Sequence, residues 1–302
     1  MNGSGTQLGV RRSTPWLFLA PYLVLFITFV AIPVVYGLWM SLHNWDQFLP
    51  EKPWVGLENY TQLFTPGSAK SAPFWSAMKA TAIFTLFSVP LLVIIPLGIA
   101  LLLNRRFPGR SFFRAVYFAP YVLGVAVVGI LFRFMLDPNI GAFNYLLSKL
   151  GFAGDTPWTT ALPWAWISLV GMTVWWTMGF NAVIYLAGLQ DIDRQLYDAA
   201  EVDGASRWQR LRHVTVPGLR SVIVFVITVT LLASANMFGQ AYLTTQGAPA
   251  EKTRTAIMFI AEEGFQDFHL GSAAAMSYVL ALFLMALSAG VFFFFRDREE
   301  AR

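Results

Sequence analysis

The 25 residues from Ala80 to Asn104 read ATAIFTLFSVPLLVIIPLGIALLLN and contain no Asp, Glu, Lys or Arg. A helix needs about 20 mostly apolar residues to cross about 30 Å of hydrocarbon, and this stretch exceeds that length. Its apolar residues fall on every face, unlike those of a helix at the surface of a soluble protein. The stretch therefore predicts a membrane-spanning helix.

Five further stretches without these charges lie on either side of it, at residues 13–45, 115–132, 156–190, 221–250 and 270–295. Together they predict six transmembrane helices near residues 16–42, 78–103, 112–135, 161–189, 219–243 and 271–295. The first apolar run is too long for the apolar region of a signal peptide, so we expect an uncleaved span. Charged residues make up 13% of the 302 residues, about half the usual share of a soluble domain. Alternating strand-like patterns are absent, and we therefore expect an all-α integral membrane protein.

The basic residues predict which side of the membrane each connection faces. Fourteen Arg residues belong to the two termini and to the connections after the second and fourth predicted helices, whereas six basic residues belong to the opposite connections. Basic residues near helix ends collect on the cytoplasmic side. We therefore expect a multi-pass protein of the cell inner membrane with cytoplasmic tails at 1–15 and 296–302 around a six-helix transmembrane domain at 16–295. The net charge of +4 is thereby explained by sorting across the bilayer, and no nucleic-acid partner is expected.

The cytoplasmic segment 190–218 differs from the rest of the chain. Residues 190–217 read QDIDRQLYDAAEVDGASRWQRLRHVTVP and contain nine charged side chains between two uncharged stretches. An Asp near its start and Ser206 can cap two short helices, and Gly204 tolerates the left-handed backbone that ends a helix. The segment predicts a helix, a glycine turn and a second helix along the membrane surface. The residues alone leave two interpretations open, which are an interfacial amphipathic helix and a docking element for another protein.

Asp198-Ala199-Ala200, then Gly204, then Val214-x-Val216-Pro217 resembles the EAA loop of ABC-importer permeases. The family pattern is Glu-Ala-Ala, three residues, Gly, nine residues and Ile-x-Leu-Pro, and the spacing matches without a gap. Asp replaces Glu, and Val replaces both Ile and Leu; the shorter acid keeps the charge and puts the length of one contact in doubt. Stretches such as VGLENYTQLF, RRFPGRSFFRAVYFAPYV, FRFMLDPNIGAFN and TTQGAP are similar to the carbohydrate-uptake branch of that family, of the maltose and glycerol-phosphate (MalF-like and UgpA-like) type.

The resemblance implies a type I ABC-importer permease fold, in which segment 190–218 supplies coupling helices between the fourth and fifth spans. It implies a heterodimer with a second permease subunit, two ATPase subunits that bind ATP and Mg, and an extracytoplasmic sugar-binding protein. No cofactor is expected on this chain, which lacks the phosphate-loop pattern G-x-x-x-x-G-K-[ST]. The residues expected to meet the ATPase are Asp198, Ala199, Ala200, Asp203, Gly204, Ala205, Trp208, Leu211, Val214 and Pro217.

Polar and aromatic residues recur on one face of the fourth and fifth predicted helices. Hydroxyl and amide groups beside aromatic rings suit a sugar, and polar groups at membrane depth need partners. The residues expected along the substrate path are Thr173, Trp176, Thr177, Asn181, Tyr185, Thr230, Ser234, Asn236 and Met237, with Asn181 and Ser234 the preferred pair. The alternative is that these groups bond back to their own helices or hold neighbouring helices together.

Three classes of function remain to be weighed. We expect import of a di- or oligosaccharide by ATP-driven alternating access. Another ABC-importer branch, with glycerol phosphate, a polyol or an amino acid as substrate, is the alternative, followed by a stand-alone secondary transporter. The predicted spans lack the buried charges that a proton-coupled carrier would use. No catalytic or metal site is expected, since Cys is absent and the three His residues are dispersed. Glu262, Glu263 and Asp267 are expected to form a solvated external face, and the alternative for them is a metal or receptor contact.

Overall fold

The computed structural model describes residues 14–105 and 107–296. Within this part every regular element is a helix, and two isolated backbone bridges, His43 to Trp54 and Asp46 to His269, hold the loop that follows α2. The all-helical class expected from the composition is therefore found. The tails expected at 1–15 and 296–302 lie almost entirely outside the described residues, and their cytoplasmic position stays a prediction.

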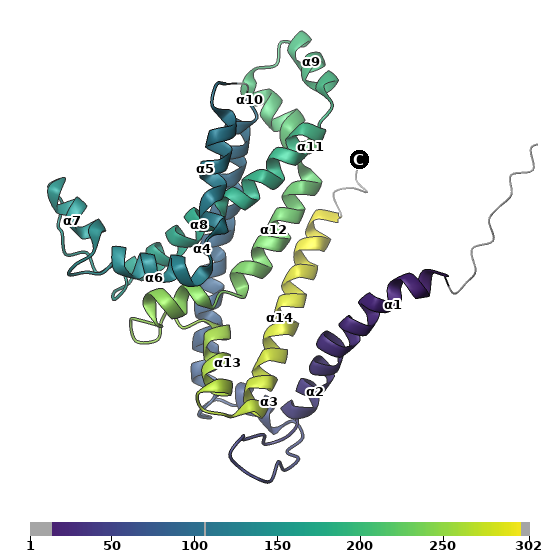
Figure 1. Ribbon diagram of the computed structural model, residues 1–302, viewed down its shortest axis with the longest axis vertical. Coiled ribbons are helices and arrows are strands. Elements are labelled where there is room, and N and C mark those ends of the chain that lie inside the picture. The colour runs from purple at the N-terminus through teal and green to yellow at the C-terminus, as the bar shows by residue number, and fades with distance from the viewer. Residues whose placement is uncertain (1–13, 106, 297–302) are drawn as a thin grey trace, which may run out of the picture.

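The first apolar helix stands apart from the others. It consists of α1 (Thr14–Phe26), a π-helical turn η1 (Ile27–Ala31) and α2 (Ile32–Ser41). No described side chain before Ser41 is buried. Figure 1 shows α1 leaning away from the remaining helices, while α2 packs beside α14 (Leu270–Arg296). This segment therefore presents an apolar surface along most of its length.

Three other helices are long and apolar enough to cross a membrane. These are α4 (Ser71–Leu103), α8 (Trp164–Asp191) and α14. In α14, the part that is long and apolar enough comprises residues 270–291. Two bent helix pairs in the described part raise the possible total from four spans to six. The protein is thus an integral, multi-pass membrane protein, and the count of six stays a prediction.

The segment 112–135, which is the third predicted span, consists of two helices in the structure. α5 (Arg110–Val122) and α6 (Val125–Met135) are bent by 93° at Leu123 and Gly124. Pro120 removes a backbone donor near the end of α5, and both linking residues have extended backbone. At about 1.5 Å per residue, α5 alone is shorter than the hydrocarbon layer. The span expected at 112–135 is therefore a bent pair of helices, and its crossing of the membrane as one span stays a prediction.

The expected fifth helix, 219–243, is also interrupted. α12 (Arg220–Ala235) ends at Asn236, and a π-helical turn η3 (Ala241–Thr245) follows. The break is held by side chains, because Asn236 Nδ2 donates to the Leu232 carbonyl at 2.8 Å and Thr255 Oγ1 donates to the Met237 carbonyl at 2.7 Å. The continuous helix expected there is replaced by α12, a break in the helix and the turn η3.

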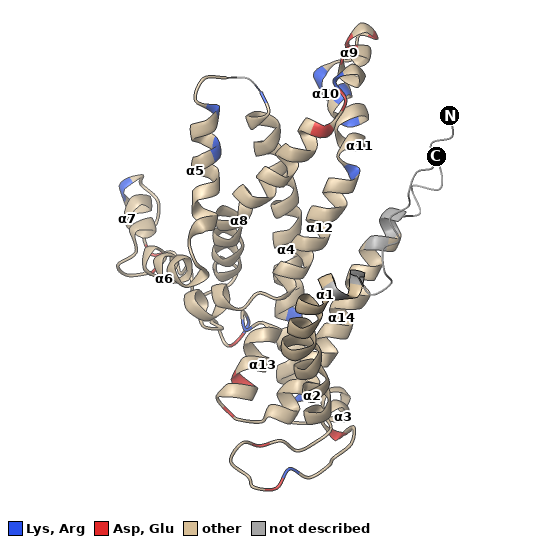
Figure 2. Ribbon diagram, turned by 45° about the vertical axis from the view of Figure 1, so that its right-hand side comes forward, with Lys and Arg blue, Asp and Glu red and all other residues tan. Residues whose placement is uncertain are grey.

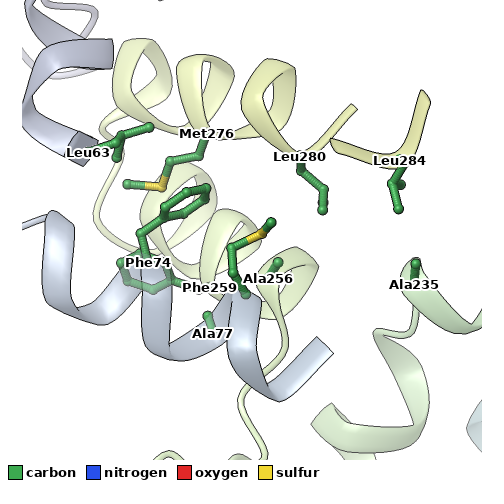
Figure 3. Packing of buried hydrophobic residues seen from close by; sticks show 10 residues of the cluster. Leu63, Phe74, Ala77, Ala235, Ala256, Phe259, Met276, Leu280 and Leu284 are labelled. Atoms are coloured by element: carbon green, nitrogen blue, oxygen red, sulfur yellow. The ribbon is translucent and has the colours of Figure 1, made fainter. Parts of the chain in front are cut away.

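Buried side chains form three clusters that follow one another along the bundle. The first cluster joins α4, α14, α3 (Glu58–Phe64) and α13 (Ala256–Phe265) through the residues of Figure 3, among them Phe74, Phe259 and Met276. The middle cluster surrounds Leu169 and Met172. The third cluster, which we call the Tyr185 cluster, is formed by Ala100, Tyr185, Leu186, Leu189, Leu219 and Val226.

Charged side chains occupy the two ends of the bundle. Figure 2 shows them at α5, α9 (Arg194–Val202) and α10 (Arg207–Arg210) at one end and in the loops around α3 and α13 at the other, with α7 (Ala142–Lys149) at the side. The long stretches of α4, α8 and α12 between these ends are almost free of charge. This distribution fits helices that pass through hydrocarbon.

Candidate functional site

The segment after α8 forms a helical hairpin, which we define as residues 193–218. α9 (Arg194–Val202) begins where Asp193 Oδ1 accepts the amide hydrogen of Gln195 at 2.9 Å. α10 (Arg207–Arg210) begins with a capping box between Ser206 and Gln209. A π-helical turn η2 (Leu211–Thr215) and α11 (Val216–Gly218) lead into α12. The helix–turn–helix expected from the sequence is therefore present.

The turn between α9 and α10 requires glycine. Gly204 has φ of 76°, its amide donates to the Glu201 carbonyl at 3.1 Å, and the Ala205 amide donates to the Ala200 carbonyl at 2.9 Å. This pair of bonds is the Schellman arrangement, which needs a left-handed residue after the helix. The short helices are thereby held in one relative direction.

Two side-chain contacts brace the hairpin. Arg210 Nη1 lies 2.8 Å from Glu201 Oε2 and links α10 to α9, while the Tyr197 and Thr215 hydroxyl oxygens lie 3.0 Å apart. The ion pair is exposed on the Glu201 side and stabilises the hairpin only weakly. The Tyr197 contact is half-buried and ties α9 to the segment that enters α12.

The structure exposes much of the expected coupling set. Exposed members are Asp198, Ala199, Asp203, Gly204, Trp208 and Pro217, and half-buried members are Ala200, Ala205, Leu211 and Val214. Trp208 is 69% exposed, and Val202, which sequence reasoning did not single out, is 89% exposed beside the glycine turn. Exposed apolar side chains next to small residues and acids make a surface suited to another protein.

A cavity of about 380 Å³ lies between α8 and α12 and extends to α5 and the break after α12. Eight of the nine residues expected on a substrate path line it, namely Thr173, Trp176, Thr177, Asn181, Thr230, Ser234, Asn236 and Met237. These eight residues therefore line one cavity, and their place on a substrate path stays a prediction.

Tyr185 is the exception in that set. Its side chain is fully buried in the Tyr185 cluster and does not line the cavity. One helical turn beyond Asn181, α8 is covered by α4 and by the start of α12, so the face of α8 that lines the cavity ends there. Sequence spacing gives the face of a helix but does not show where along that face a neighbour closes over it.

Aromatic rings form part of the cavity wall. Tyr121 of α5 stacks on Phe180 of α8 with centroids 4.7 Å apart and planes at 17°. Trp176 Nε1 donates to the Leu123 carbonyl at 2.9 Å, which fixes the indole at the bend between α5 and α6. Sequence reasoning missed Tyr121 and Phe180 because the bend that turns α5 toward α8 has only Pro120 and Gly124 as a signal.

The polar groups in the cavity are neutral. Thr173 and Thr177 donate to carbonyls one turn earlier in α8, each at 2.8 Å, and keep lone pairs free as acceptors. Ser88 Oγ of α4 donates to Ser234 Oγ at 3.0 Å. No described residue that lines the cavity carries a charge. The cavity can thus accept and donate hydrogen bonds beside apolar ring faces.

The end of the bundle around α13 holds charged side chains in pairs. Glu263 is buried and pairs with Lys70 at the start of α4, and His269 Nδ1 lies 3.1 Å from the same carboxylate oxygen. Glu262 Oε2 lies 3.2 Å from Arg254 Nη1, and burial raises the pKa of Glu262 against the lowering effect of that arginine. The solvated face expected for these acids is therefore wrong for Glu263. The described residues include no cluster of three or more potential metal ligands.

Residues 73–298 match the protein family described as the binding-protein-dependent transport system inner membrane component. The match begins near the start of α4 and includes the helical hairpin and the cavity, so it covers well over half of the chain.

Two relatives and one solved structure show the range of similar proteins. The trehalose/maltose transport system permease protein MalF of Thermococcus litoralis is 33% identical, over 88% of this chain and 89% of its own. The sn-glycerol-3-phosphate transport system permease protein UgpA of Agrobacterium fabrum is 31% identical, over 95% of this chain and 96% of its own. A bacterial ABC transporter involved in the import of the acidic polysaccharide alginate has a chain of the same fold, with a TM-score of 0.81, 24% identity and coverage of 94% and 95%.

Proposed function

The chain belongs to the family of binding-protein-dependent transport system inner membrane components, and from that premise we propose that it is a permease subunit of a sugar-importing ABC transporter. The observation that carries the sugar assignment is the uncharged cavity between α8 and α12. Its stacked rings offer apolar faces to the C–H side of a sugar ring, and its hydroxyl and amide oxygens offer hydrogen-bonding groups. A relative that transports trehalose and maltose supports the same substrate class.

A neutral di- or oligosaccharide fits the cavity better than a phosphorylated substrate. A phosphate group taken from water needs compensating positive charge or several donors, and none of the described cavity residues is Lys or Arg. Glycerol phosphate remains the second candidate because a 31% identical relative transports it. Charge supplied by the second permease subunit would be required in that case.

The hairpin 193–218 is the proposed contact with a cytoplasmic ATPase. Exposed Trp208 and Val202 supply apolar surface, Asp198 supplies charge, and the small residues Ala199 and Gly204 permit close approach. Because the hairpin joins α8 directly to α12, a push on it reaches both cavity-lining helices. ATP binding and hydrolysis on two ATPase subunits would then drive alternating access, with ATP and Mg held by those partners.

The remaining partners follow from the family and from the open side of the cavity. A second permease subunit would complete the cavity as a heterodimer, and an extracytoplasmic binding protein would deliver the sugar to the external loops. A permease of another importer branch, or a carrier that acts alone, is the alternative. The absence of ionisable groups among the described cavity residues disfavours an ion-coupled carrier.

The experiment is uptake of labelled sugar by the complete transporter in proteoliposomes. Asp198→Lys should leave assembly in the membrane intact and reduce sugar uptake at least several-fold while ATP hydrolysis continues. Asp155→Lys, at an exposed acid on the opposite side of the membrane, is the matched control and should transport normally. Normal coupled uptake by Asp198→Lys would rule out the docking assignment.

A further inference from the structure

A proline in α4 leaves one backbone acceptor without its usual partner at the edge of the cavity. Pro96 lies inside α4 and has no amide hydrogen, so the carbonyl of Leu92, four residues earlier, lacks its helical donor. Asn181 Nδ2 of α8 donates to that carbonyl at 2.9 Å. The side chain of Asn181 thus takes the place of the missing backbone group, which a membrane interior would not hydrate.

The same amide reaches a third helix. Asn181 Nδ2 also donates to Thr230 Oγ1 of α12 at 3.2 Å, which uses its second hydrogen. Asn181 is 6% and Thr230 4% exposed, so water does not compete for these bonds. One amide therefore joins α4, α8 and α12.

The position of this junction decides what it can do. Asn181, Leu92 and Thr230 line one end of the cavity, and the Tyr185 cluster lies directly beyond them. α8 leads into the hairpin 193–218, and α12 leads out of it. The junction therefore connects the two helices that bear the hairpin, and fixes both to α4.

We propose that Asn181 is a positioning residue that makes α4, α8 and α12 move as one unit when the hairpin is displaced. The expected effect on transport rests on the proposed function. The claim that Asn181 donates the hydrogen bond that Pro96 cannot supply rests on the structure alone. Both amide hydrogens are already engaged, so only Oδ1 could reach a substrate. Loss of the amide should therefore reduce the sugar carried per ATP more than it changes the KM for sugar.

A double-mutant cycle tests directly whether the Asn181 amide replaces the backbone donor that is missing at Pro96. Asn181→Leu keeps a side chain branched at Cγ with the same number of heavy atoms and leaves the Leu92 carbonyl unpaired, so we expect the melting temperature to fall by about 5 °C. Pro96→Ala restores a backbone donor for that carbonyl and should remove about half of this loss in the double variant. Pro90→Ala, which restores a donor for the carbonyl of Leu86 instead, is the matched control and should remove none. If Asn181→Leu lowers the melting temperature equally in the wild-type, Pro96→Ala and Pro90→Ala proteins, Asn181 does not replace the missing backbone donor.

Transport by the complete complex tests the mechanical consequence. We expect Asn181→Leu to lower the sugar-to-ATP ratio several-fold at saturating sugar, and Pro96→Ala to restore part of that ratio. A raised KM with an unchanged ratio would instead make Asn181 a sugar contact and refute the positioning role. A wild-type complex without any sugar uptake would refute the proposed function and with it the transport role, while the melting-temperature cycle would still decide the hydrogen-bond claim.

Discussion

Replacement of Gly204 by alanine isolates the contribution of the hairpin turn. The φ of 76° is left-handed, and an added Cβ would meet no atom within 4 Å, so the cost is backbone strain alone. That strain is about 1–2 kcal/mol for an L-residue, which corresponds to a factor of about 5–30 in the population of the native turn. Because few contacts hold the exposed hairpin, the strain should be relieved there rather than spread through the bundle.

The assay compares sugar uptake and ATP hydrolysis by reconstituted complexes. Gly204→Ala should bind the ATPase about 5–30-fold more weakly and transport correspondingly less at limiting ATPase, and added ATPase should restore uptake. Gly151→Ala is the matched control, since Gly151 has φ of 84°, has nothing within 4 Å of its added Cβ, and follows α7 away from the hairpin. An equal defect in both variants, or none in Gly204→Ala, would refute the reasoning.

Three further changes address packing, folding and the cavity. Lys70→Met should destabilise the protein by about 3 kcal/mol because it leaves the buried Glu263 carboxylate with only its contact to His269. The double variant with Glu263→Met should regain most of that stability, and thermal unfolding in detergent measures both. Gly179→Val should prevent accumulation in the membrane, because a Cβ there would lie 2.0 Å from the Tyr117 carbonyl oxygen, whereas Gly171→Val, with open space, should accumulate normally in the same membrane-fraction blot. Trp176→Phe keeps a ring but loses the bond to the Leu123 carbonyl, so uptake kinetics should show a several-fold higher KM for sugar, and an unchanged KM would contradict the assigned role.

Much of the fold could be predicted because hydrocarbon imposes a simple rule on sequence. Charge-free stretches locate α4, α8 and α14 to within a few residues, apart from the start of α4, which lies earlier at Ser71. The hairpin was also predictable, since capping residues and Gly204 act locally. Both features depend on short-range physical chemistry that a single sequence reveals.

The features that the sequence did not predict have a different cause, which is contact between residues far apart in the chain. The bend between α5 and α6 is fixed partly by Trp176, 53 residues away from the carbonyl that it contacts, and the break after α12 is held by Thr255. Glu263 is an external acid by sequence position, yet it is buried against Lys70. Hydropathy and spacing contain no record of these partners, so they could not have been predicted from the pattern alone.

Receptor-dependent uptake by proteoliposomes tests most directly whether this chain is a sugar permease. The complete complex, with its ATPase and binding protein, should accumulate a labelled neutral di- or oligosaccharide only when ATP is hydrolysed. The same vesicles prepared without this chain should accumulate none, and glycerol phosphate should not compete. Accumulation that persists without this chain or without ATP hydrolysis, or that is confined to a phosphorylated substrate, would contradict the assignment.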